Sequence, residues 1–180
     1  MTLCPTVSIR RPVRSISESA GDPEVVREMA LRHLDRRAYG TAELTAVLVR
    51  KGADPEVVGD VLARLAGVGL LDDQAYAEGL VEVKHGARHM SRRAVALDLT
   101  RRGLSSDVVT AATASLDDES DWAGAREVAA RYARRLVGLD DATAWRRLAG
   151  ALARKGYGPS VVSQVTKEVL NNRRQEVWND

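Results

Sequence analysis

The sequence predicts an all-α protein built from three tandem three-helix repeats, with about nine helices in an elongated and curved body. The pentapeptide L-x-R-[K/R]-G occurs three times, at 48–52, 99–103 and 152–156, and Val-Val follows each copy after four further residues. Aligning the three glycines gives a period of about fifty residues, which is typical of a structural repeat. The chain has no Phe and only 4% aromatic residues, so Leu, Val and Ala must form the core, a mixture that favours packed helices.

Each repeat is expected to open with a leading helix. In the first repeat, Asp22 is a favourable N-cap and Pro23 suits the first helical position. Asp72 or Asp73 is expected to cap the leading helix of the second repeat, and Asp121 to begin that of the third. The three leading helices are expected at 23–37, 73–88 and 121–138.

The other two helices of each repeat are expected to meet at the shared glycine. The residue that follows a helix end often has positive φ, which glycine adopts without strain, so we assign these glycines to folding. They are Gly52, Gly103 and Gly156. The next helices are expected to begin at Asp54-Pro55, at Ser105 or Ser106, and at Gly158-Pro159.

The period also sets the expected domain limits: a flexible leader at 1–22, then repeats at 23–71, 72–117 and 118–180, the last with a C-terminal tail. The single cysteine, Cys4, has no intrachain partner, which argues for a reducing compartment. No segment is apolar and long enough for a signal sequence or a membrane span, so we expect a cytoplasmic protein. No self-complementary seam is evident, and a monomer is therefore expected.

The sequence gives little support for an enzyme or a cofactor. Phosphate-binding glycine loops and the G-x-S-x-G nucleophile motif do not occur. His85 and His89 have the i, i+4 spacing of metal ligands, but Gly86 lies between them and no third ligand is evident, so we predict no metal site. Paired aspartates occur at predicted helix starts, where capping explains them.

Basic residues are the remaining candidates for function. Although the net charge is only +2, residues 84–103 carry six Lys or Arg and one acid, Asp98. The R-[K/R] pairs before each glycine complement the negative end of a helix dipole, which is one sufficient explanation for them. Repetition along three modules would also create a periodic basic stripe, suited to a periodic polyanion or to a protein polymer wrapped around one. Further arginines cluster at 131, 134 and 135 and at 146 and 147.

Three linked motifs resemble the bacterial RecX family of regulatory proteins. They are E-L-x-x-x-L-x-R-K-G at 43–52, V-L-x-R-L at 61–65 and G-L-L-D-D-x-x-Y-A at 69–77. The likeness covers about residues 23–175. The chain departs from the family at Gly40, where a small hydroxyl residue is more usual, and at Val95, in a column that holds leucine in the other two repeats.

The resemblance implies three three-helix repeats and a negative regulator of the RecA recombinase, acting in DNA repair and the SOS response. Its partner would be the RecA filament on single-stranded DNA. Binding in the filament groove would block extension or promote disassembly, and so suppress ATP hydrolysis, strand exchange and co-protease activity. No catalysis and no cofactor are implied.

Neither the residues nor the resemblance fixes the contact surface. Our hypothesis is that basic residues at the repeated helix ends and on the second repeat face the partner. They are Arg50, Lys51, Arg92, Arg93, Arg101, Arg102, Arg154 and Lys155. The first alternative is a stand-alone DNA-binding three-helix module, since basic helix ends also hold phosphates, and even a filament regulator is expected to bind DNA weakly. A further alternative is a helical-repeat scaffold for another protein, which would be indifferent to the recombinase.

Overall fold

The computed structural model describes residues 21–179, with side chains as far as residue 172. These residues form nine α-helices and one π-helical segment, and no strand occurs among them, which confirms the predicted all-α class. The expected leader at 1–22 lies almost wholly outside the described residues. Within residues 21–179, no helix has both the length and the apolar character needed to cross a membrane.

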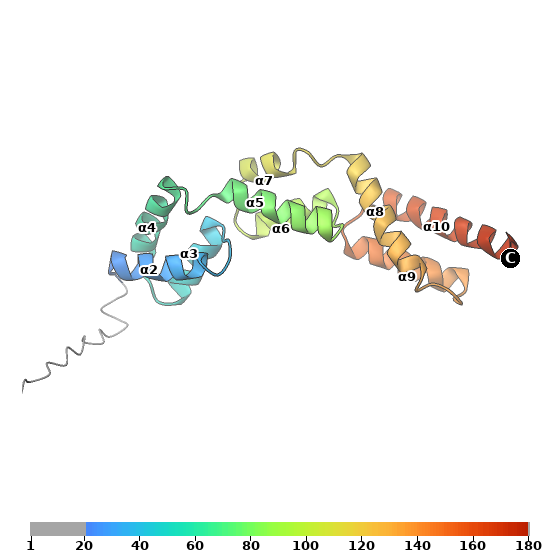
Figure 1. Cartoon of the computed structure of the whole chain (residues 1–180), viewed down its shortest axis with the longest axis horizontal. Coiled ribbons are helices and arrows are strands. Elements are labelled where there is room, and N and C mark those ends of the chain that lie inside the picture. Colours follow the sequence, from blue (N-terminus) through green and yellow to red (C-terminus); the bar gives the residue numbers. More distant parts are fainter. Residues whose placement is uncertain (1–20, 180) are drawn as a thin grey trace, which may run out of the picture. The chain divides into compact units, whose positions relative to one another are not determined.

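The helices follow one another in three sets, which we call the first, second and third modules (Figure 1). The first module comprises α2 (Pro23–Leu34), α3 (Thr41–Arg50) and α4 (Pro55–Gly67). The second comprises α5 (Asp73–Val81), η1 (Glu82–Ala87), α6 (Arg92–Arg101) and α7 (Ser106–Thr113). The third comprises α8 (Asp118–Ala133), α9 (Asp141–Arg154) and α10 (Pro159–Asn179).

The described chain packs as two compact units. Unit 1 contains residues 21–38 and 44–71, and unit 2 contains residues 39–43 and 72–179. The second and third modules therefore share one unit, and the segment that begins α3 belongs with them. The predicted repeat limits at 23–71, 72–117 and 118–180 stay predictions.

Unit 1 has a core of aliphatic side chains from α2, α3 and α4. Val26 on α2, Leu44 on α3 and Val58 on α4 are fully buried. The predicted caps are present: Asp22 accepts a hydrogen bond from Glu24 N at 3.0 Å. The Asp54 side chain accepts hydrogen bonds from the backbone N–H groups of Glu56 and Val57 in the first turn of α4. Caps of this kind satisfy backbone donors that the helix itself leaves without partners.

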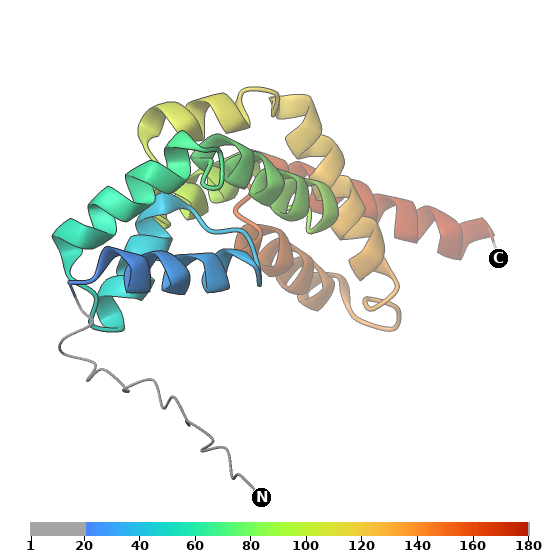
Figure 2. The same ribbon diagram turned by 60° about the vertical axis from the view of Figure 1, so that its left-hand side comes forward.

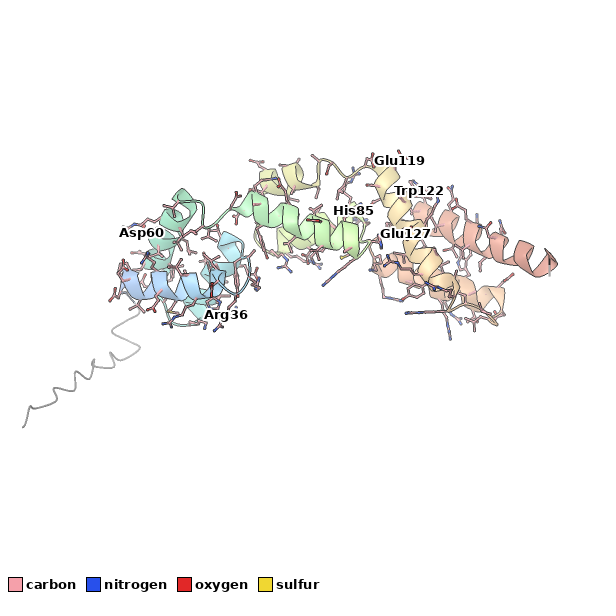
Figure 3. All side chains as sticks on the ribbon, in the orientation of Figure 1. Arg36, Asp60, His85, Glu119, Trp122 and Glu127 are labelled. Atoms are coloured by element: carbon pink, nitrogen blue, oxygen red, sulfur yellow. The ribbon has the colours of Figure 1, made fainter. Side chains whose placement is uncertain are left out.

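Unit 2 has two apolar clusters, one in each of its modules. In the third module, α8, α9 and α10 pack against one another, as the orange and red ribbons show (Figure 2). Trp122, which projects from α8 (Figure 3), packs against this cluster while remaining partly exposed. The two apolar columns of the sequence repeat are fully buried in all three modules; they are Leu44, Val95 and Leu148, and Leu48, Leu99 and Leu152.

The second leading helix differs from the prediction of a continuous helix over 73–88. Asp72 caps α5 as expected, with its carboxylate 2.9 Å from Gln74 N, but α5 ends at Val81 and the chain continues as the π-helical η1. Lys84 lies in η1 and is only 9% exposed, and its Nζ lies 3.0 Å from Asp98 Oδ2. This ion pair to α6 is a tertiary contact, which helical periodicity does not encode.

The third leading helix also differs, because Asp121 does not begin it. Asp117 is the N-cap: its side chain accepts from Ser120 N at 2.8 Å while Ser120 Oγ accepts from Asp117 N at 3.1 Å. This capping box starts α8 at Asp118, three residues earlier than predicted, and the helix ends at Ala133 rather than near residue 138. The first leading helix likewise ends early, at Leu34.

Candidate partner interface

Each shared glycine ends its helix in the same hydrogen-bonded turn. In the first module, Gly52 N donates to Val49 O at 2.9 Å and Ala53 N donates to Leu48 O at 3.2 Å. These two bonds define a Schellman motif, whose glycine position needs positive φ. Equivalent bonds occur in the other two modules. The φ values are 92° at Gly52, 83° at Gly103 and 88° at Gly156.

The first residue of each R-[K/R] pair has the same environment in all three modules. Arg50, Arg101 and Arg154 are the last residues of α3, α6 and α9, and each side chain is exposed. None of the three forms an ion pair within the described part of the chain. Lys51, the second residue of the first pair, is also exposed. These charges are available to a partner.

The second residue of the middle pair, Arg102, lies instead in a polar network inside unit 2. Its Nε donates to Asp98 Oδ2 at 2.8 Å and its Nη1 donates to Tyr76 Oη at 2.9 Å. Tyr76 in turn donates to Glu43 Oε2 at 2.7 Å. Burial alone would raise the pKa of Asp98, but hydrogen bonds from Arg102 and Lys84 outweigh it and lower that pKa. The charge of Arg102 is thus used to hold unit 2 together.

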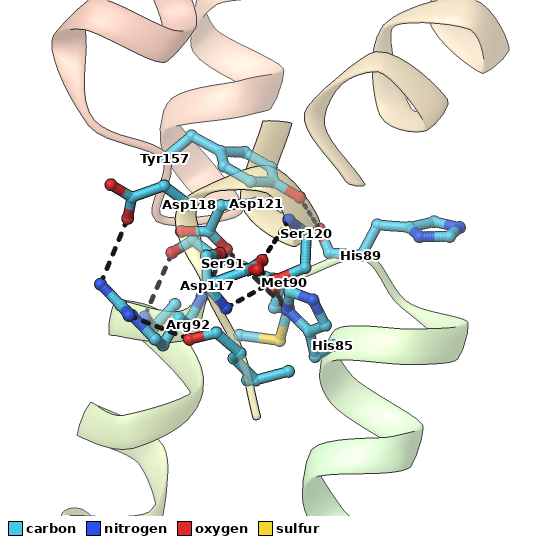
Figure 4. A network of polar contacts seen from close by, with 12 residues as sticks. His85, His89, Met90, Ser91, Arg92, Asp117, Asp118, Ser120, Asp121 and Tyr157 are labelled. Carbon is cyan, nitrogen blue, oxygen red and sulfur yellow. Dashed lines mark hydrogen bonds and ion pairs between the residues drawn. The ribbon is translucent and has the colours of Figure 1, made fainter. Parts of the chain in front are cut away.

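The second residue of the last pair, Lys155, is also used within unit 2. Its Nζ donates to the carbonyl of Arg88, and its own carbonyl accepts from Ser91 N at 3.0 Å. Beside it, Tyr157 Oη donates to the carbonyl of His89 at 2.9 Å, and burial raises the pKa of this tyrosine (Figure 4). His89 has a φ of 49°, so the third module binds a strained turn at the end of η1.

Within unit 2, a hydrogen bond from a backbone N–H group to a carboxylate joins successive modules at two equivalent places. Asp73, in the first turn of α5, accepts from Thr41 N, the first backbone donor of α3, at 2.7 Å. Asp121, in the first turn of α8, accepts from Arg92 N, the first backbone donor of α6, at 2.8 Å (Figure 4). The leading helices of the second and third modules thus each accept from the first backbone donor of the preceding middle helix, and on α6 this bond adds to the N-cap that Ser91 supplies.

Two of the shared glycines, Gly103 and Gly156, also lie close against the preceding module. A β-carbon on Gly103 would lie 2.6 Å from Ala42 Cβ, and one on Gly156 would lie 2.5 Å from Ala94 Cβ. Both alanines belong to the first turn of a middle helix in the preceding module. A β-carbon on Gly52 would meet no atom within 4 Å. The first glycine is therefore needed for its φ alone, whereas the other two also allow close packing between modules.

The two members of the remaining predicted pair, Arg92 and Arg93, also differ in whether they are used within the chain. Arg92 donates from Nη1 to the carbonyl of Leu116 at 2.9 Å and lies 3.4 Å from Asp118 Oδ1. Arg93 is exposed and has no ion-pair partner among the residues whose side chains are described. The eight residues of the sequence hypothesis thus form two groups: three used within the chain, and five available at its surface. The available ones are Arg50, Lys51, Arg93, Arg101 and Arg154.

Comparison with known proteins identifies the family. Sequence models of the RecX family match in chain order: its first three-helix domain at residues 27–65, its second at 72–112 and its third at 118–166. The chain is 34% identical over 160 residues to the regulatory protein RecX of Streptomyces coelicolor, covering 88% of this chain and 85% of the relative. The chain belongs to the RecX family. This confirms the resemblance drawn from residues 43–77.

Other RecX family members agree in extent and fold. The regulatory protein RecX of Mycobacterium avium is 34% identical over 173 residues, 96% of this chain and 95% of its own. A crystal structure of a regulatory protein RecX matches with a TM-score of 0.71 at 19% identity, covering 81% of this chain and 73% of that one. The crystal structure of RecX from Lactobacillus salivarius matches with a TM-score of 0.69 at 17% identity, covering 82% of this chain and 96% of that one. RecX is a family of regulatory proteins rather than of enzymes.

The structure gathers four arginines in the third module, and only one of them, Arg154, belongs to the predicted contact set. An open groove of about 410 Å³ in the third module is lined by Tyr132, Arg135, Leu136, Arg146, Arg147 and Arg154. The sequence signal for this group was the spacing of Arg146, Arg147 and Arg154 on one helix, because residues seven or eight apart lie on the same helix face. The sequence alone could not show that the end of α8 brings a fourth arginine to this face.

Proposed function

We propose that this protein is a negative regulator of the RecA recombinase and binds in the groove of the RecA filament on single-stranded DNA. It blocks filament extension or promotes disassembly, and so suppresses ATP hydrolysis, strand exchange and co-protease activity. Membership of the RecX family supports this proposal. The observation that carries it is the exposed arginine at the same helix end of all three modules, Arg50, Arg101 and Arg154.

The repetition suits a partner that is itself a repeating polymer. A helical filament presents equivalent surfaces at regular intervals, and three equivalent charges on one chain address several of them at once. Exposed charges at an interface steer association and fix orientation more than they add affinity. We therefore propose Arg50, Lys51, Arg93, Arg101 and Arg154 as the filament-facing set. Arg92, Arg102 and Lys155 instead support the module junctions within unit 2.

The test is the rate of ATP hydrolysis by RecA from the same organism on long single-stranded DNA that is already coated. The protein is titrated from well below equimolar with RecA up to equimolar, and its affinity for naked DNA is measured in the same buffer. Inhibition well below equimolar, with much weaker binding to naked DNA, supports filament regulation through filament ends. Absence of inhibition at equimolar protein overturns the proposal.

The stand-alone DNA-binding module remains the second candidate, and the arginine-lined groove of the third module is the observation that favours it. A DNA-binding module binds duplex tightly, with a steep dependence on salt, whether or not RecA is present. A filament regulator acts chiefly when the recombinase is present. The two titrations above therefore separate these functions.

A further inference from the structure

The arginine-lined groove has one wall on α9. Leu148 and Leu152 of this helix are fully buried in the core of the third module, whereas Arg146, Arg147 and Arg154 are exposed. From the first to the last of these arginines is eight residues, or about 12 Å along the helix axis. The basic wall is therefore longer than one small anion.

Gly150 keeps this wall open. It lies one turn from Arg146 and one turn from Arg154, between the two along the helix. A β-carbon on Gly150 would lie 3.3 Å from Arg154 Nη1, so the guanidinium of Arg154 lies back over the glycine. The guanidinium of Arg154 therefore occupies space that a side chain at position 150 would restrict.

The other wall is formed where α8 ends. The guanidinium of Arg135 lies 5.3 Å from the centroid of the Tyr132 ring, within the range of a cation–π contact. Tyr132 packs against the core of the third module, and Leu136, only 1% exposed, also lines the groove. The position of Arg135 is therefore fixed by an aromatic ring that is itself fixed by the core.

No carboxylate with a described side chain forms an ion pair with any of the four arginines of the groove. Other arginines of unit 2 do have such partners: Arg126, for example, lies 3.3 Å from Glu168 Oε2. Four like charges gathered in one concave surface repel one another and focus a positive potential. An external anion with several charges relieves that repulsion.

We propose that this groove binds the phosphodiester backbone of a single nucleic-acid strand, with the guanidinium groups of Arg135, Arg146, Arg147 and Arg154 on successive phosphates. The planar fork of arginine matches phosphate oxygens in a bidentate manner. A groove of about 410 Å³ accepts a few backbone units of a flexible strand. A flexible single strand can adjust the spacing of its phosphates to the four arginines, whereas the stiff backbone of a duplex cannot.

The lining favours phosphate over an acidic peptide. Tyr132 and Leu136 are the two apolar lining residues, and Arg135 already lies over the ring of Tyr132, so there is little surface for a peptide side chain or a stacked base. Binding is therefore electrostatic and independent of base sequence. This site goes beyond the proposed function, because it assigns the third module a contact with nucleic acid that does not require the recombinase.

The test is fluorescence anisotropy of a labelled oligothymidylate titrated with the full chain, without RecA, between about 50 and 200 mM salt. The variant Arg146→Gln/Arg147→Gln removes two groove charges. The control Arg36→Gln/Arg64→Gln removes two exposed charges from unit 1, so that both variants have the same net charge. Circular dichroism confirms that each variant is folded.

The groove variant is expected to bind the strand about tenfold more weakly at the lower salt. The slope of log affinity against log salt is expected to fall in magnitude by about 1.4, since each phosphate contact on a single strand contributes about 0.7. The control is expected to change neither quantity by a comparable amount. A second variant, Gly150→Glu, places a carboxylate among the arginines and is expected to abolish binding.

Three results would overturn the proposal. The first is an unchanged affinity and slope in the groove variant, and the second is an equal loss in the control, which would indicate general charge. The third is stronger competition by a duplex of the same length or by polyglutamate than by unlabelled oligothymidylate. The first two results concern only the groove. Inhibition of RecA is measured separately and remains an independent test of the proposed function.

Discussion

Replacing Gly103 by alanine tests whether the shared glycines of the later modules serve two purposes. This residue has a φ of 83°, and an added β-carbon would lie 2.6 Å from Ala42 Cβ. Ala42 Cβ is attached directly to the backbone, so it moves only with α3 itself. Gly52 has a similar φ of 92° but open space around it, and it supplies a matched control.

The expected magnitudes follow from these two geometries. A left-handed conformation costs a residue with a β-carbon about 1–2 kcal/mol, and this is the whole expected cost of Gly52→Ala. An overpacked contact adds about 1–3 kcal/mol, so Gly103→Ala is expected to cost about 2–5 kcal/mol. Part of the second term should be recovered by Ala42→Gly, which removes the atom that the new β-carbon would meet.

The assay is urea denaturation followed by helical circular dichroism, applied to both single variants and to the pair Gly103→Ala/Ala42→Gly. Ala42→Gly alone is expected to cost about 0.5–1 kcal/mol through helix propensity. We expect the double variant to be more stable than the sum of the single effects predicts, by 1 kcal/mol or more, as double-mutant cycles of touching residues show at about that scale. Equal losses for Gly52→Ala and Gly103→Ala, or strict additivity in the cycle, would refute the close-packing role.

The remaining predictions concern the polar contacts of unit 2. Tyr76→Phe removes the hydroxyl that joins Glu43 to Arg102 and is expected to lower the free energy of unfolding by about 1–3 kcal/mol; an unchanged urea midpoint would contradict this. Asp98 has a lowered pKa, so its stabilisation is complete above the pKa of the unfolded chain, about 3.9, and is lost as pH falls through the lower folded value. Asp98→Asn should therefore flatten the loss of stability below about pH 4 in acid titrations, and an unaltered profile would argue against it. Asp121→Ala removes the acceptor of Arg92 N while Ser91 still caps α6, and it should cost about 0.5–2 kcal/mol by the same denaturation assay; no loss would exclude a stabilising role for this bond.

Local patterns predicted the helices and several of their caps, although all three leading helices end earlier than expected. The columns through Leu48 and Leu99 are buried because residues four apart share one helix face. Asp22, Asp54 and Asp72 cap helices because a short carboxylate next to the first turn reaches its free backbone donors. Each of these features depends on residues within one or two turns of one another.

Contacts between modules were not predictable in the same way. Arg102 and Lys155 have the same local sequence as Lys51, but Arg102 binds Glu43 and Lys155 binds the carbonyl of Arg88, both far away along the chain. A single sequence pattern treats all three as equivalent helix-end cations. Only the pairing of successive modules within unit 2 makes the second basic residue structural there and leaves the first one exposed.

The start of α8 shows the same limitation on a smaller scale. Asp117 and Asp121 are both suitable caps by residue type. Ser120 completes a capping box with Asp117, while the carboxylate of Asp121 is used by Arg92 N of the second module. A local capping box makes Asp117 the N-cap, whereas the role of Asp121 depends on a contact with another module.

The most direct test of the proposed regulation is RecA ATPase inhibition by the variant Arg50→Glu/Arg101→Glu. These two exposed arginines occupy the same helix end in different modules and lie outside the groove proposed for nucleic acid. Arg36→Glu/Arg64→Glu provides the same change in net charge elsewhere on the surface. If the repeated arginines face the filament, the first variant needs about tenfold more protein for half-inhibition while the control inhibits like the natural chain. Equal inhibition by both variants and the natural chain would contradict the account.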